Sequence, residues 1–229
     1  MKPNHKLNCM KKILAILLTI SLLSMRPVKK MKIIFFGDSI TQMGIDKGGY
    51  IDRMKTAIND MRLHNKYELV GAGIGGNKVY DLYLRMEEDV LSKMPEEVVI
   101  YVGVNDVWHK TSGTGTDIDK FEKFYIAIIK KLQAKNIKVA VATPACIGEL
   151  KNNANPQDDD LNKYSDVIRK LAATYNCTLV DLRAMWQQYE EENNKENKEQ
   201  GLITTDRVHL TEMGNQMVAD AMLKALSIQ

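Results

Sequence analysis

The sequence predicts an α/β protein, a three-layer α/β/α sandwich around a five-stranded parallel sheet. Five short apolar runs are rich in Val and Ile, and several of them do not alternate with polar residues. This pattern is typical of strands that are buried on both faces of a sheet. Segments with helical spacing lie between the runs, and regular alternation of strand and helix indicates a parallel sheet covered by helices. The runs span residues 32–36, 67–70, 97–102, 137–142 and 178–181.

Three segments between these runs place their apolar residues on one helical face, which implies a sheet to pack against. They span residues 50–61, 118–132 and 161–175. A final helix is expected over residues 211–226, without a sixth strand after it. The polar and charged segment 193–200 is expected to be a solvated loop or the end of a helix.

The length of 229 residues suits one domain with a full core but not two. Hydrophobic residues make up 45% of the chain and charged residues 27%, which excludes disordered, collagen-like and membrane-bundle proteins. We therefore expect one folded domain over residues 31–229, preceded by a separate leader over residues 1–30.

The leader has the pattern of a secretory signal segment. Lysines precede an apolar run over residues 13–23, and a basic group follows it. The run is about half as long as the roughly 20 residues that a membrane-spanning helix requires. We therefore expect a secreted or periplasmic protein with no stable membrane span. No small-x-small cleavage site follows the run, so an uncleaved amphipathic or anchoring segment is the alternative.

The positive net charge belongs to the leader. Residues 1–30 hold seven of the 32 Lys and Arg residues and none of the 29 Asp and Glu residues. The rest of the chain therefore has 25 basic and 29 acidic residues, although the whole chain has a formal charge of +3. Because no basic stripe with interleaved aromatic residues occurs, we expect no nucleic-acid partner.

Two cysteines lie in the predicted domain. Cys146 follows one predicted strand, and Cys177 precedes the next parallel strand, so the two fall at opposite ends of the sheet. A strand of about five residues is longer than the distance that a disulfide can bridge. We expect two free thiols.

Polar and glycine-rich segments follow three of the predicted strands, and a fourth precedes the final helix. In parallel α/β sheets, ligands bind outside the carboxyl ends of the strands, so these segments are expected to converge on one site. They comprise residues 37–41, 73–77, 103–106 and 206–209.

Ser39 is the candidate nucleophile, and a serine hydroxyl needs a base that an acid holds in the useful tautomer. Of the four histidines, His5 lies in the leader and His64 at a helix end far from the carboxyl ends of the strands. His209 is favoured over His109 because Asp206 precedes it by three residues.

Acyl transfer also needs hydrogen-bond donors aimed at the developing oxyanion. The backbone N–H of Ser39, the backbone N–H of Gly76 and the side-chain amide of Asn105 are the candidates. Taken singly, Gly76 also suits a tight turn and Asn105 a loop cap.

Taken in order, these segments resemble the motif blocks of the GDSL (SGNH) hydrolase family over residues 32–226. The blocks fall on 37–40, Gly76, 103–106 and 206–209. The resemblance implies a flavodoxin-like strand order, no cofactor, and the four name-giving residues Ser39, Gly76, Asn105 and His209. Relatives often have Asn or Arg ahead of the second-block glycine, where this chain has Gly71 and Ala72, so Gly73 and Gly75 are alternatives to Gly76.

We therefore predict a serine esterase that hydrolyses carboxylic esters through an acyl-enzyme, with no cofactor and no metal ion. Polar segments at residues 111–116 and 148–159 are the candidate rims of the site. The polar rim, the absence of a long apolar lid and the predicted secretion favour an acetyl group on a carbohydrate. A lysophospholipase or a thioesterase of the same fold is the alternative.

Other classes fit the sequence less well. Gly71, Gly73 and Gly76 match the G-x-G-x-x-G pattern of dinucleotide-binding oxidoreductases. Such enzymes also need an acidic residue at the end of the following strand, but here that strand ends in Gly103. The nucleophile elbow of α/β-hydrolases, G-x-S-x-G, does not match, because Thr41 occupies the place of its last glycine. No metal-ligand spacing occurs, which disfavours a metal-dependent hydrolase. A non-catalytic glycan-binding module is disfavoured because no member of the catalytic set is missing.

Overall fold

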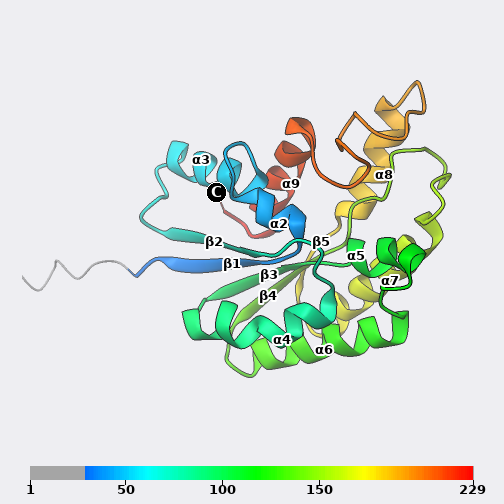
Figure 1. Ribbon diagram of the computed structural model, residues 1–229. Coiled ribbons are helices and arrows are strands. Elements are labelled where there is room, and N and C mark those ends of the chain that lie inside the picture. Colours follow the sequence, from blue (N-terminus) through cyan, green and yellow to red (C-terminus); the bar gives the residue numbers. More distant parts are fainter. Residues whose placement is uncertain (1–28, 229) are drawn as a thin grey trace, which may run out of the picture. The chain divides into compact units, whose positions relative to one another are not determined.

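The computed structural model describes residues 29–228, and the fold begins with β1 at Met31 (Figure 1). The predicted signal segment, residues 1–30, lies outside the described residues except for its last two positions. Met31–Gln229 forms one compact unit. Within residues 29–228, no helix has the length and hydropathy needed to cross a membrane.

The sheet has five parallel strands in the order β2-β1-β3-β4-β5. This is the flavodoxin-like order, so the predicted fold class is confirmed. β3 is the middle strand and is buried along its whole length, as its unbroken run of apolar residues predicts. The strands are β1 (Met31–Gly37), β2 (Tyr67–Gly73), β3 (Glu97–Tyr101), β4 (Lys138–Ala142) and β5 (Thr178–Val180).

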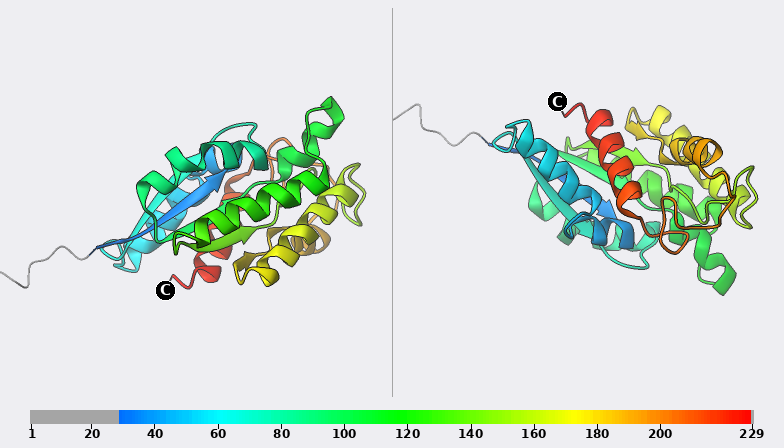
Figure 2. Two further views of the ribbon diagram at one scale, coloured as in Figure 1. Left: turned by 90° about the horizontal axis from the view of Figure 1, so that it is seen from below. Right: turned by 90° about the horizontal axis from the view of Figure 1, so that it is seen from above.

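Helices cover both faces of the sheet, which gives the three predicted layers. α3, α8 and α9 lie on one face, and α4, α6 and α7 lie on the other (Figures 1 and 2). The two longest helices, α6 and α7, bury apolar residues at helical spacing. The helices are α2 (Ser39–Gly44), α3 (Tyr50–Asp60), α4 (Val79–Asp89), α5 (Val104–Trp108), α6 (Ile118–Gln133), α7 (Asp158–Thr174), α8 (Leu182–Asn193) and α9 (Glu212–Ala225), with short 3-10 turns η1 (Leu91–Lys93) and η2 (His109–Ser112).

Four helices were not predicted from the sequence, and the largest error in a strand boundary is at β2, which ends three residues later than predicted. α2 and α5 are too short to show a periodic pattern, and α4 and α8 carry charged residues among the apolar ones. β2 continues through Gly73, so the glycine-rich segment begins inside the strand and not after it. Asn193 is the last residue of α8, and residues 194–200 form a loop that is exposed except at Asn194, which agrees with the predicted helix end or solvated loop.

Cys146 and Cys177 are free thiols, as predicted. Burial raises the pKa of the Cys177 thiol to about 11, and it raises that of Cys146 well above its ordinary value. Neither thiol is therefore activated as a nucleophile at neutral pH.

Candidate active site

Ser39, His209 and Asp206 form one hydrogen-bonded chain. The Oγ of Ser39 lies 2.9 Å from Nε2 of His209, and Nδ1 of the same ring lies 2.6 Å from Oδ2 of Asp206. An ionised carboxylate can only accept hydrogen bonds, so Nδ1 carries the ring proton and Nε2 is left to accept from the serine hydroxyl. This is the geometry that general-base activation of a serine requires.

The Asp206 carboxylate also fixes the backbone of its own loop. Its Oδ1 accepts from the backbone N–H of His209 at 2.8 Å and of Val208 at 3.2 Å. Partial burial raises the pKa of Asp206, but the hydrogen bonds from the His209 ring and from the two backbone groups lower it by more, so it stays below its ordinary value. The acid therefore remains ionised and keeps the ring in one tautomer.

A buried carboxylate behind this loop sets its position. Glu149 is fully buried, and its Oε1 accepts from the backbone N–H of Ile203 at 3.0 Å and from the hydroxyl of Thr204 at 2.6 Å. Its Oε2 accepts from the N–H of Leu202 at 2.9 Å. The neighbouring Gly148 donates its N–H to the carbonyl of Arg207 at 2.8 Å, inside the catalytic loop. The loop after β4 therefore braces the segment that carries the base.

Ser39 is presented by the turn from β1 into α2. Asp38 is the N-cap of α2, and its Oδ1 accepts from the N–H of Ile40 at 3.0 Å. An N-cap aspartate commonly accepts a hydrogen bond from a backbone N–H in the first turn that would otherwise have no partner. The candidate nucleophile is consequently the first residue of a helix that starts at the carboxyl end of β1, an interior strand of the sheet.

The structure separates the three candidate glycines of the second block. Gly73 belongs to β2, and a Cβ there would meet the backbone nitrogen of Gln42 at 2.1 Å, so this glycine allows α2 to approach the sheet. The N–H of Gly75 is occupied by Oε1 of Gln42 at 2.7 Å. Gly76 is exposed, has a φ of +76° and has nothing within 4 Å of a Cβ position. Of the three, Gly76 is the best placed to offer its N–H to a ligand.

Asn105 lies in α5, after the neighbouring strand β3, and is buried. Its Nδ2 donates to the carbonyl of Asn77 at 3.1 Å, which ties it to the loop of Gly76. An amide nitrogen has two N–H groups, so the second one is available for a substrate oxygen. The adjacent Asp106 accepts from the N–H of Val79 and holds the start of α4.

Sequence reasoning missed Arg85, which holds the loop of Gly76 from α4. Its Nε donates to Oδ1 of Asn77 at 2.7 Å, and its Nη2 donates to the carbonyls of Gly37 at 2.8 Å and Ala72 at 3.0 Å. One guanidinium therefore joins the ends of β1 and β2 to the candidate oxyanion loop. No local signal could have found this role, because the partners of Arg85 lie on other elements and Gly37 is 48 positions away in the sequence.

We expect Arg85→Met to lower kcat by up to about 10²-fold with little change in KM, because a displacement of about 1 Å in a positioned group has effects of that size. Steady-state hydrolysis of p-nitrophenyl acetate measures both constants. Asp89→Asn is the matched control, since it removes only the outer ion pair of the same guanidinium, at 2.6 Å. If both variants lose equal activity, Arg85 does not act through the loop.

Two buried carboxyl groups lie beneath the site. Burial raises the pKa of Asp38 to about 7, against the opposing hydrogen bond from Ile40, and it raises the pKa of Asp106 to about 6. Each is also almost inaccessible to solvent, at 2% and 0% exposure. Because both pKa values are higher in the folded protein than in the unfolded chain, the free energy of unfolding depends on pH.

Asp38→Asn is expected to stabilise the protein more as pH rises from 4 to 8. In the wild type, the unfolded carboxyl loses its proton near its ordinary pKa of 3.8, but the folded one keeps it to about 7, so the free energy of unfolding falls across this window. The variant has no carboxyl group at this position and so does not lose stability in this way, and its Asn side chain can still accept the hydrogen bond from the N–H of Ile40. Melting temperatures of both proteins measure the difference, and a gap that shrinks with rising pH would contradict the assignment.

His109 and His64 are not part of the hydrogen-bonded chain. His109 begins η2 after α5 and is partly buried, and its pKa is lowered by burial and by the nearby Lys78. His64 is exposed in the loop before β2, at the amino-terminal ends of the strands, whereas Ser39 follows the carboxyl end of β1. Among the described residues, no group of three or more His, Cys, Asp and Glu side chains could hold a metal ion.

The two predicted rim segments differ in exposure. Residues 111–114 are exposed, whereas the segment 148–159 is mixed: Gly148, Glu149, Asn155 and Asp158 are buried, and residues 152–154 are exposed. Asp158 also begins α7. The second segment therefore also supports the loop that carries Asp206 and His209, and it is not simply a rim of the site.

Comparisons with known proteins show which family the chain belongs to. A profile of the GDSL-like Lipase/Acylhydrolase family matches residues 35–217. The crystal structure of the acetyl xylan esterase AlAXEase is 60% identical, covers 85% of this chain and 99% of its own, and superposes with a TM-score of 0.84. The acetylxylan esterase of Geobacillus stearothermophilus is 25% identical over 86% of this chain and 94% of its own. An uncharacterised lipoprotein of Bacillus subtilis (strain 168) is 24% identical over 66% of this chain and 70% of its own.

The family match covers most of the chain, including Ser39, Gly76, Asn105 and His209, and the 60% identical relative spans nearly all of the described fold. The resemblance drawn from the four motif blocks is thereby confirmed. The chain belongs to the GDSL-like lipase/acylhydrolase family and is a serine ester hydrolase.

Proposed function

We propose that this protein removes acetyl groups from a carbohydrate, with Ser39 as nucleophile, His209 as general base and Asp206 as its orienting acid. The observation that carries the proposal is the continuous contact from Ser39 Oγ to His209 Nε2 at 2.9 Å and from His209 Nδ1 to Asp206 at 2.6 Å. The relatives named as acetylxylan esterases support an acetyl group and a xylan-type carbohydrate as the two parts of the substrate.

The reaction follows from the geometry in two halves. Ser39 Oγ attacks the ester carbonyl while its proton passes to Nε2 of His209, and the N–H groups of Ser39 and Gly76 and the amide of Asn105 stabilise the oxyanion. The imidazolium then gives its proton to the departing sugar oxygen, which leaves an acetyl-enzyme. Water attacks this ester with the same base, and acetate departs as the serine recovers its proton.

A series of p-nitrophenyl esters from acetate to decanoate tests the size of the acyl group. We expect kcat/KM to be highest for acetate and to fall steadily with chain length. Acetate release from acetylated xylan, followed in parallel, tests the alcohol part. A maximum at long chains with no acetate release would favour a lysophospholipase, and hydrolysis of acyl-thioesters alone would favour a thioesterase.

We also propose that the protein is exported. The apolar run over residues 13–23 with its basic flanks supports this proposal, and so does the lipoprotein among the relatives. N-terminal sequencing of the protein from native cell fractions is the test. A chain that begins at Met1 in the cytoplasm would rule export out.

A further inference from the structure

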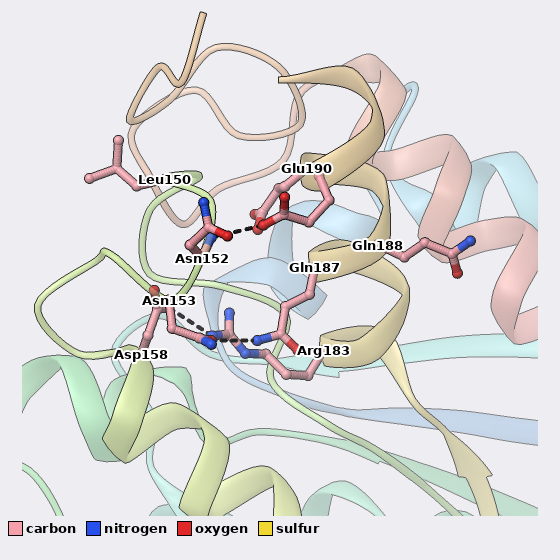
Figure 3. A pocket seen from close by; sticks show the side chains of 9 residues that line it. Leu150, Asn152, Asn153, Asp158, Arg183, Gln187, Gln188 and Glu190 are labelled. Atoms are coloured by element: carbon pink, nitrogen blue, oxygen red, sulfur yellow. Dashed lines mark hydrogen bonds and ion pairs between the residues drawn. The ribbon is translucent and has the colours of Figure 1, made fainter. Parts of the chain in front are cut away.

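A polar pocket lies between α8 and the loop that follows β4, and none of the triad residues line it. It has a volume of about 340 Å³. Arg183, Gln187 and Glu190 line it from α8, and Asn152 and Asn153 line it from the facing loop (Figure 3). This is more than ten times the roughly 30 Å³ that one water takes, and it falls within the range of about 300–1,000 Å³ of ligand sites.

One carboxyl oxygen in the wall of this pocket lacks a hydrogen-bond partner among the described residues. Glu190 is only 3% exposed, and its Oε1 has no hydrogen-bond partner within residues 29–228. A buried polar atom without a partner is unfavourable by about 1–3 kcal/mol, so such atoms are usually matched by something outside the chain. Burial raises the pKa of Glu190 to about 8, which makes this side chain both a donor and an acceptor at neutral pH.

The one basic residue of the lining is already paired, which argues against an anionic ligand. Arg183 is 1% exposed and is neutralised by Asp158 at 2.7 Å, and its other nitrogens donate to Asn162 at 2.8 Å and to the carbonyl of Ala145 at 3.2 Å. All three guanidinium nitrogens already have partners in the protein, so this side chain is not available to bind an anion. No carboxylate cluster suited to a metal ion occurs in the described part of the chain.

The remaining polar groups of the wall suit hydroxyl groups. Side-chain amides at three positions face the pocket and can each donate and accept, and Leu150 is the single apolar residue among the nine in the lining. The amide of Gln187 already donates to Oδ1 of Asn153 at 2.9 Å, which fixes the wall before a ligand enters. The three amides belong to Asn152, Asn153 and Gln187, whereas the side chain of Gln188 points away from the pocket and donates to Glu192 at 3.0 Å (Figure 3).

The pocket opens at the same edge of the sheet as the triad. Its loop follows β4 and its helix follows β5, so both lie at carboxyl ends of strands. Gly148 of the same loop donates its N–H to the carbonyl of Arg207, which lies between Asp206 and His209. We propose that this pocket binds one neutral sugar unit of the carbohydrate whose ester is cleaved at Ser39, an inference that rests on the proposed function.

Titration of the protein with unesterified xylotetraose, followed by two-dimensional NMR, tests the proposal. We expect shifts of backbone signals at the pocket. Glu190→Gln keeps a donor and an acceptor and should leave the Kd within about threefold of wild type, whereas Glu190→Leu should weaken binding at least about tenfold. Glu190→Leu removes a buried polar atom without a partner, so its melting temperature should not fall.

Two kinetic assays separate this inference from the proposed function. Both variants should hydrolyse p-nitrophenyl acetate like the wild type, and Glu190→Leu should raise KM for acetylated xylan several-fold. Gln187→Leu, on the partly exposed wall, should raise it too and stands in if Glu190→Leu does not fold. Shifts confined to the surroundings of Ser39, or an unchanged KM in both Leu variants, overturn the sugar site alone. A wild-type protein inactive on both esters overturns the proposed function instead.

Discussion

Ser39→Ala and His209→Ala are each expected to lower kcat on p-nitrophenyl acetate by about 10⁶-fold, and the double variant should be no slower than either. The two residues act on one proton transfer across the 2.9 Å contact, so losing either one removes the same step. Single-turnover hydrolysis with excess enzyme measures the residual rates. The prediction fails if the losses multiply in the double variant.

Two further variants show whether the base is assigned correctly. Asp206→Asn should lower kcat by less than His209→Ala does, because the acid orients the ring and stabilises its charged form without taking the proton. His109→Ala should retain most of the activity, since His109 makes none of the hydrogen bonds that link Ser39, His209 and Asp206. Inactivity of His109→Ala beside an active His209→Ala would reverse the assignment of the base.

Asn105→Ala is expected to lower kcat by about 10²- to 10³-fold with little change in KM, the usual result of removing one oxyanion donor. The structure adds a second cause, because the same side chain donates to the carbonyl of Asn77 at 3.1 Å and so helps to place the loop of Gly76. Initial rates over a range of substrate concentrations separate the two constants.

Asn77→Ala is the companion variant for this prediction. It removes the side-chain bond from Arg85 to the loop but leaves the backbone carbonyl that Asn105 contacts. A smaller loss of kcat than in Asn105→Ala is therefore expected. A rise in KM that equals the fall in kcat/KM would mean that Asn105 positions the substrate and does not stabilise the transition state.

The fold and the family could be predicted from the sequence because both depend on local patterns. Buried parallel strands consist of short Val- and Ile-rich runs, and the positions after them carry the chemistry. The prediction of a serine ester hydrolase is confirmed by the family match over residues 35–217. The roles of Ser39, His209, Asp206, Gly76 and Asn105 stay predictions, which the variants above test.

What escaped the sequence analysis depends on contacts between distant parts of the chain. Glu149 holds residues 202–204 across more than 50 positions, and Arg85 reaches Gly37 across 48. A charged residue in an apolar stretch or on a helix face indicates burial but does not reveal the partner. The choice among Gly73, Gly75 and Gly76 likewise depended on Gln42 of α2, which no spacing within the glycine segment reveals.

The distance of 170 positions between Ser39 and His209 has a consequence for the order in which activity arises during synthesis. Chains are made and begin to fold from the N-terminus, so β1 and its serine exist long before the loop that carries the base. A nascent chain that ends before residue 209 therefore has Ser39 but not the candidate base. If His209 is the base, ester hydrolysis begins only after the segment 206–209 has been made and has folded against the end of β1.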